Sequence, residues 1–71
     1  MTKIEVKYAG YDKGWDIFRD GTYVQSSMDK SSCIWHALRI SKSYKESNLI
    51  VQNENGAIER SMKFFNGELY G

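Results

Sequence analysis

Two dipeptides, Asp20-Gly21 and Asn55-Gly56, each lie between segments rich in β-branched and aromatic residues. A two-residue hairpin turn of type I′ requires positive φ at both central residues, which Gly adopts freely and Asp or Asn tolerates. Each dipeptide is therefore expected to join two antiparallel strands. The predicted strand pairs are 15–19 with 22–25, and 48–52 with 57–64.

A further strand and one helix are predicted around these hairpins. Ile4, Val6 and Tyr8 alternate with charged residues, which is the period-two pattern of a strand with one face on a core. Between the hairpins, the apolar residues of 29–44 fall within one arc when they are placed at about 100° per residue. Asp29 is expected to cap the N-terminus of this helix.

These elements follow one another in the order ββ(β)αββ and indicate one small α+β domain over residues 1–71. We expect a small antiparallel sheet of four to five strands, with one amphipathic helix packed on one face. The chain is long enough for one domain with a modest core. The predicted core is Ile4, Val6, Trp15, Ile17, Val24, Cys33, Ile34, Ala37, Leu38, Ile40, Leu49, Val51, Ile58 and Met62.

Composition argues against several classes of protein. Ten Lys and Arg against nine Asp and Glu leave a net charge of +1, so no global field steers the chain toward nucleic acid or anionic lipid. The single cysteine, Cys33, cannot form an intramolecular disulfide, which favours a reducing, cytoplasmic setting. No segment approaches the roughly 20 apolar residues of a membrane span, and no membrane association is expected.

Cys33 and His36 are the one candidate pair of nucleophile and base, three residues apart on the predicted helix. A cysteine–histidine enzyme also needs a group that orients the histidine and an oxyanion site, and the sequence indicates neither. One Cys and one His fall short of the three or four protein ligands of a zinc site. The glycines match neither a phosphate loop nor a dinucleotide fingerprint. We therefore expect no catalytic residues, no metal and no cofactor.

Several structural positions recur in a known pattern. They are Gly14-Trp15-Asp16-Ile17, the Asp20-Gly21 turn, helix positions Ile34, Ala37 and Ile40, Leu49-Ile50-Val51, and Asn55-Gly56-Ala57-Ile58. In this pattern, over about residues 13–62, the chain resembles the uncharacterised bacterial and phage family known as domain-of-unknown-function family 2188. The resemblance implies a single-helix α+β fold, with Trp15 and Ile17 in the core and Asn55-Gly56 as a hairpin turn. It implies no activity, substrate or catalytic residue.

Trp35 and Phe18 depart from that pattern, since the family tends to be polar at both positions. Trp35 lies near the middle of the polar arc of the helix, four residues before Arg39. A guanidinium can rest on the ring of a Trp at this spacing, and that contact alone would account for the pair. Trp and Arg are also enriched at the centres of protein interfaces, so an interface anchor is the other interpretation.

Phe18 raises the same question on the sheet. If Trp15 and Ile17 face the helix, Phe18 faces the other side, where Tyr23 is a candidate neighbour. One helix leaves that side uncovered, unless the C-terminal apolar residues fold back over it as a lid. These residues are Phe64, Phe65, Leu69 and Tyr70.

The sequence thus predicts a non-enzymatic binding or interaction module that acts through protein–protein contacts or as a homodimer. The candidate interaction residues are Trp35, Arg39, Phe18 and Tyr23. The alternative is a small nucleic-acid-binding domain, in which aromatic side chains on an open sheet stack on bases while Arg19 and Arg60 follow the phosphates.

Overall fold

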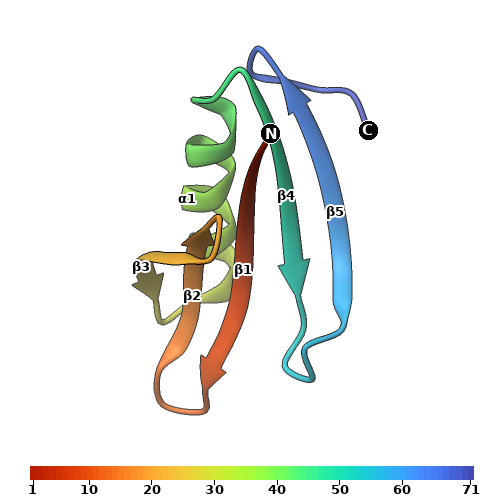
Figure 1. Cartoon of the computed structure of the whole chain (residues 1–71). Coiled ribbons are helices and arrows are strands. Elements are labelled where there is room, and N and C mark those ends of the chain that lie inside the picture. The colour runs from red at the N-terminus through yellow and green to blue at the C-terminus, as the bar shows by residue number, and fades with distance from the viewer.

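The computed structural model describes residues 1–71 and contains one helix and one six-stranded sheet. The α+β class predicted from the sequence is confirmed. In Figure 1 the helix lies against one side of the sheet, the two longer loops between strands lie at one end, and both termini lie toward the other end. The elements are β1 (Thr2–Gly10), β2 (Gly14–Arg19), β3 (Thr22–Ser27), α1 (Lys30–Lys42), β4 (Glu46–Gln52), β5 (Ile58–Phe65) and β6 (Glu68–Leu69).

The strand order is β3-β2-β1-β4-β5-β6. The two central strands, β1 and β4, are parallel, with Ile4 opposite Leu49 and Val6 opposite Val51. All other neighbouring strands are antiparallel. The predicted wholly antiparallel sheet of four to five strands was therefore wrong. The strands β1 and β3 are both antiparallel to β2, so they run in the same direction. The helix α1 then returns the chain to the end of the sheet where β1 begins, so β4 starts beside β1 and runs parallel to it.

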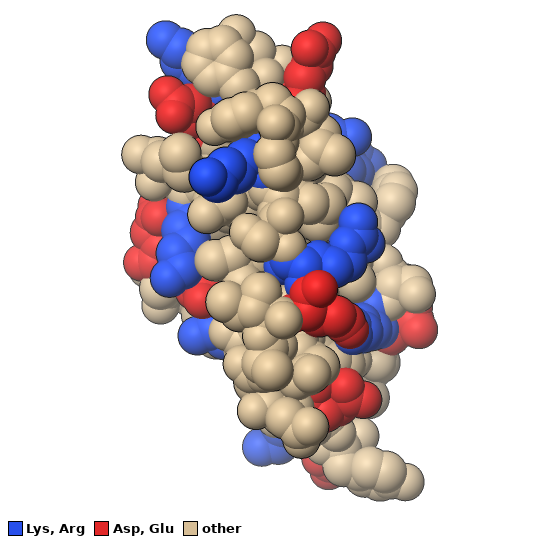
Figure 2. Space-filling model, turned by 90° about the vertical axis from the view of Figure 1, so that its right-hand side faces the viewer, with Lys and Arg blue, Asp and Glu red and all other residues tan.

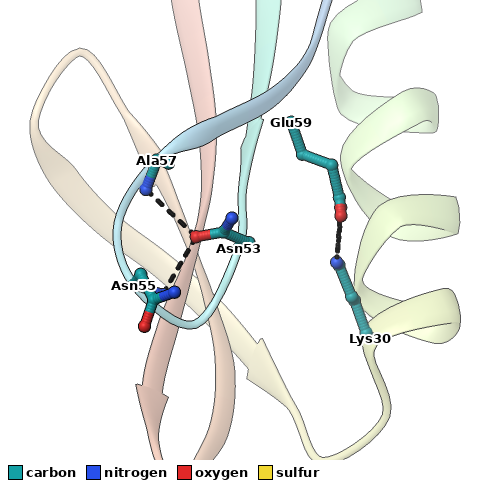
Figure 3. A network of polar contacts seen from close by, with 5 residues as sticks. All are labelled: Lys30, Asn53, Asn55, Ala57 and Glu59. Carbon is teal, nitrogen blue, oxygen red and sulfur yellow. Dashed lines mark hydrogen bonds and ion pairs between the residues drawn. The ribbon is translucent and has the colours of Figure 1, made fainter.

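The predicted hairpin turns differ in outcome. Asp20 and Gly21 have φ of 49° and 85°, as a type I′ turn requires. At the second site only Gly56, at 84°, has positive φ, so Asn55-Gly56 is not a two-residue turn of this type. The loop spans residues 53–57 instead and closes on Asn53, whose Oδ1 accepts hydrogen bonds from the backbone N–H groups of Asn55 (2.9 Å) and Ala57 (3.1 Å) (Figure 3).

A third hairpin turn was not predicted. Asn66 and Gly67 have φ of 52° and 83°, and they join β5 to β6, where Phe65 pairs with Glu68. The Asn-Gly signal was present in the sequence. It does not predict a hairpin by itself, because β6 has only two residues, too few to show the alternation of a strand.

The core lies between α1 and the sheet. Phe64, a candidate lid residue in the sequence, is buried here. Val24 and Ile58, predicted in the core, are 38% and 64% exposed. Both lie beside register shifts, where a bulge turns a side chain out of the strand's alternation. The buried apolar residues are Ile4, Val6, Trp15, Ile17, Cys33, Ala37, Leu49, Val51, Met62 and Phe64.

Small residues let α1 lie close to the sheet. Cys33, Ala37 and Ser41 are fully buried on one side of the helix, and the Ser47 hydroxyl of β4 donates a hydrogen bond to the Ser41 carbonyl at 2.7 Å. The larger predicted core residues of the helix are only partly buried and pack around this contact. They are Ile34, Leu38 and Ile40.

Polar contacts fix the start of α1. The carboxylate of Asp29 accepts a hydrogen bond from the backbone N–H of Ser32 at 3.0 Å, which confirms the predicted N-cap. The ammonium of Lys30 contacts both carboxylate oxygens of Glu59 in β5, at 2.5 and 2.8 Å (Figure 3). It also lies 4.9 Å from the ring centroid of Trp15. Lys30 therefore connects the first turn of the helix to two strands.

Candidate binding surface

The side of the sheet away from α1, hereafter the open face, has no second layer. Because side chains alternate along a strand and register partners share a face, its members follow from the strand pairing. They are Lys3, Glu5 and Lys7 from β1, Asp16 and Phe18 from β2, Tyr23 and Ser26 from β3, Glu46, Asn48, Ile50 and Gln52 from β4, Ile58, Ser61, Lys63 and Phe65 from β5, and Glu68 from β6.

Phe18 and Tyr23 form an aromatic pair on the open face. They are register partners on β2 and β3, and their ring centroids lie 6.1 Å apart in an edge-to-face arrangement. The ammonium of Lys7 lies 5.2 Å from the Phe18 ring centroid. The Tyr23 hydroxyl donates a hydrogen bond to Ser26 Oγ at 3.1 Å. This hydrogen bond fixes the outer end of the pair.

Glu5, which the sequence did not single out, occupies the centre of the open face. Its register partners are Phe18 on one side and Ile50 on the other, and the ammonium groups of Lys3 and Lys7 lie 3.7 and 3.8 Å from its carboxylate. With these neighbours around it, Glu5 is only 9% exposed. A charged residue has thus lost most of its water on the uncovered side of the sheet.

Charge on the open face is nearly balanced. Its members include three lysines, Lys3, Lys7 and Lys63, against four carboxylates, Glu5, Asp16, Glu46 and Glu68. The same mixture is visible at the β5 side of the molecule, where blue and red groups alternate over the surface (Figure 2). The open face therefore has no excess of positive charge to attract a polyanion.

Trp35 and Arg39 form the second predicted pair, on the outer side of α1. The Arg39 guanidinium lies 4.9 Å from the Trp35 ring centroid, and Trp35 remains 53% exposed. The ring of His36 meets Trp35 edge-on at 5.0 Å. Since α1 covers the other side of the sheet, Trp35 and Phe18 lie on opposite sides of the molecule. The four predicted residues therefore form two separate surfaces.

The arginines named for the nucleic-acid alternative both lie on the helix side of the sheet. Arg19 donates a hydrogen bond to the Tyr44 hydroxyl at 3.3 Å. Arg60 contacts Met62 Sδ at 3.5 Å. Neither residue joins Phe18 and Tyr23 on the open face, because each alternates with an open-face residue along its strand.

The C-terminal lid, the alternative to an uncovered open face, is not formed. Phe64 belongs to the core. The other three apolar residues lie at one corner of the sheet, where they line a cavity of about 400 Å³ together with Glu46 and Glu68. The lining apolar residues are Phe65, Leu69 and Tyr70. These residues do not cover Phe18 and Ile50 of the open face.

Cys33 and His36 do not form an activated pair. Burial, and to a smaller extent the negative charge of Asp16, raises the pKa of the Cys33 thiol to about 11. The thiol is therefore protonated near neutral pH, and a protonated thiol is a poor nucleophile. The imidazole of His36 packs against Trp35 instead.

No group of three or more His, Cys, Asp or Glu side chains is arranged to hold a metal ion. The one helix, α1, is neither long enough nor apolar enough to cross a membrane. Comparisons of the chain with protein-family models, with curated proteins and with solved structures find no match.

Proposed function

We propose that this chain is a non-enzymatic binding module that self-associates through the open face of its sheet. The observation that carries the proposal is the row Tyr23, Phe18, Glu5, Ile50 and Ser61, which crosses five strands on the uncovered side. Tyr23 is 54% exposed there, and Phe18 and Ile50 are each half-buried, so part of their apolar surface remains in contact with water. Burying them against another protein surface would be favourable.

Glu5 supports this assignment rather than opposing it. A carboxylate that enters an interface normally loses its hydration at a cost of several kcal/mol. Glu5 is already shielded within one chain, with Lys3 and Lys7 beside it. Covering the row therefore adds little to the desolvation that folding has already imposed on this residue.

A second copy is the occupant that suits the charges. In a two-fold symmetric dimer the same surface meets itself, so the surface must carry groups that complement one another. Lysines and carboxylates are interspersed on the open face in nearly equal number, so lysines of one copy can face carboxylates of the other. A polyanion such as nucleic acid would meet as much repulsion as attraction.

Light scattering coupled to size-exclusion chromatography, over a range of concentrations, tests the proposal. The mass of the natural chain should rise toward that of two copies. Phe18→Ser should weaken self-association by about tenfold or more, because a central aromatic residue contributes on the order of 2 kcal/mol to an interface. Trp35→Ala, on the opposite side of the molecule, is the control and should change nothing. A natural chain that stays monomeric, or a Phe18→Ser variant that associates as the natural chain does, would contradict the proposal.

The nucleic-acid alternative has its own measurement. Fluorescence anisotropy with labelled single-stranded and duplex DNA and RNA at low salt should show no binding, because the open face lacks an excess of positive charge. Saturable binding that weakens steeply with added salt would favour the alternative over self-association.

A further inference from the structure

The cavity at the corner of the open face is separate from the row that contains Phe18. It lies where β4 begins and β5 ends, has a volume of about 400 Å³, and is lined by Glu46, Phe65, Glu68, Leu69 and Tyr70. This volume falls within the range of protein pockets that hold small ligands.

Strand pairing places the polar and apolar groups of this cavity in a fixed order. Phe65 pairs with Glu46 of β4 on one side and with Glu68 of β6 on the other. The Asn66-Gly67 turn makes the second pairing by reversing the chain directly after β5. Consequently, one aromatic ring lies between two carboxylates on neighbouring strands.

The last residues of the chain are held beside β5 by backbone hydrogen bonds. The N–H of Tyr70 donates to the carbonyl of Lys63 at 2.9 Å, and the N–H of Lys63 donates to the carbonyl of Gly71 at 2.9 Å. The Tyr70 side chain thereby lines the cavity from the side opposite β4. The lining thus consists of two aromatic residues and two glutamates, together with Leu69, whose register partner Phe64 faces the helix side.

The electrostatics of the cavity favour a cation. No Lys or Arg lines it, and neither Glu46 nor Glu68 takes part in any of the ion pairs, which involve only Glu5 and Glu59 as acceptors. Aromatic rings attract cations at their faces, and the methylene groups of a long basic side chain pack well on apolar surface. Rings, aliphatic surface and free carboxylates together match a lysine or arginine side chain.

We propose that this cavity receives a basic side chain, lysine or arginine, from a partner polypeptide. The inference goes beyond self-association, since it rests on the corner cavity and not on the row that contains Phe18. The partner is defined by this one requirement, a long side chain that ends in a cation.

An NMR titration of the full ¹⁵N-labelled chain tests the proposal with a matched pair of probes. The first is lysine capped as its N-acetyl N-methylamide. The second is norleucine with the same caps, which has the same aliphatic stem but no charge. The lysine probe should shift the amide signals of the residues that line the cavity in a saturable manner, and norleucine should do so much more weakly.

Glu→Gln variants test whether the charge of the cavity, rather than its shape alone, drives binding of the lysine probe. Glu46→Gln and Glu68→Gln should each weaken binding of the lysine probe by about twofold to fivefold, the range expected for one exposed ion pair. Glu54→Gln, an exposed carboxylate in the loop at the other end of the sheet, is the control and should bind the probe as the natural chain does. Added salt should weaken binding, because the charges are at the surface.

Four outcomes would overturn the proposal: no saturable shift with the lysine probe, equal binding of norleucine, no effect of the two Glu→Gln changes, or loss of self-association in Glu68→Gln. In the last case the basic side chain would come from a second copy rather than from a partner. Phe18→Ser separates this inference from the proposed self-association. That variant should lose self-association and still bind the lysine probe normally.

Discussion

At the scale of single residues, two buried serines face each other and differ in one hydrogen bond. The hydroxyl of Ser47 donates to the Ser41 carbonyl at 2.7 Å, whereas the hydroxyl of Ser41 is buried without a hydrogen-bond partner. A buried polar group without a partner costs about 1–3 kcal/mol, and a satisfied one contributes about 1 kcal/mol. The same chemical change at the two positions should therefore have opposite effects.

Ser41→Ala should raise the free energy of unfolding by about 1 kcal/mol, because it removes the unpaired hydroxyl and places the best helix former in α1. Ser47→Ala should lower it by about 1 kcal/mol, because it removes a buried hydrogen bond. Urea denaturation of the two variants beside the natural chain measures both changes. Destabilisation of similar size in both would mean that the Ser41 hydroxyl is satisfied in solution.

The buried Cys33 thiol makes stability depend on alkaline pH. Its pKa is raised from 9.0 to about 11 in the folded chain, mainly by burial. The folded state therefore binds this proton more tightly than the unfolded state, so the contribution is complete below about pH 9 and is lost as the pH rises to about 11. The loss should be on the order of 2 kcal/mol. Urea denaturation across this range should show an alkaline decline that is shallower in Cys33→Ala, and equal declines in both chains would contradict the prediction.

At the scale of elements, the loop between β4 and β5 depends on Asn53 rather than on Asn55. Asn53 Oδ1 accepts two backbone hydrogen bonds within the loop, while the side chain of Asn55 forms none and its backbone φ is not positive. Asn53→Ala should lower the free energy of unfolding by about 1 kcal/mol, as loss of a helix cap does. Asn55→Ala should stay within a few tenths of a kcal/mol. Thermal unfolding of the two variants compares them directly, and a larger loss in Asn55→Ala would mean that the loop adopts the two-residue turn.

Local elements could be predicted from the sequence because their causes are local. The alternation around Ile4 and Val6, the Asp29 cap and the Asp20-Gly21 turn each depend on residues within a few positions of one another. The exposure of Val24 could not be predicted in this way, because the bulge that turns it outward arises from the register between β2 and β3. The sequence pattern alone placed Val24 in the core.

The contacts of the candidate site likewise divide into local ones, which the sequence predicts, and long-range ones, which it does not. The Phe18–Tyr23 pair follows from one hairpin, and the Trp35–Arg39 pair from helical spacing, so both contacts were accessible to reasoning from sequence. The row of Glu46, Phe65 and Glu68 combines two strand registers, one of which depends on the two-residue β6. No local pattern marks Glu46 and Glu68 as neighbours of the same ring.

At the scale of the whole molecule, the parallel pairing of β1 with β4 decides how the sheet holds together. The two strands are more than 40 residues apart along the chain, and no feature of either segment alone indicates which neighbour it takes. The pairing places the first strand of the chain at the centre of the sheet and the last strand at its edge. The two ends of the chain therefore differ greatly in their importance for stability.

Two deletions of four residues each measure this difference. Removal of residues 2–5 takes away buried Ile4 and Glu5 and four of the five register pairs that join β1 to β4. Removal of residues 68–71 takes away only exposed side chains and a strand with one neighbour. A domain of this size has only about 5 kcal/mol of stability to lose. The first deletion should therefore abolish cooperative unfolding, and the second should lower the free energy of unfolding by about 1–2 kcal/mol, the equivalent of a few exposed hydrogen bonds.

Circular dichroism during thermal and urea unfolding distinguishes these outcomes. The chain without residues 68–71 also lacks three residues of the corner cavity, so it should fold and yet fail to bind the capped lysine probe. Cooperative unfolding after removal of residues 2–5 would show that most of the parallel β1–β4 pairing is dispensable, and this pairing could then not be what unites the two halves of the sheet. Loss of folding in the other deletion would show instead that the edge formed by β6 carries stability that its exposed side chains do not reveal.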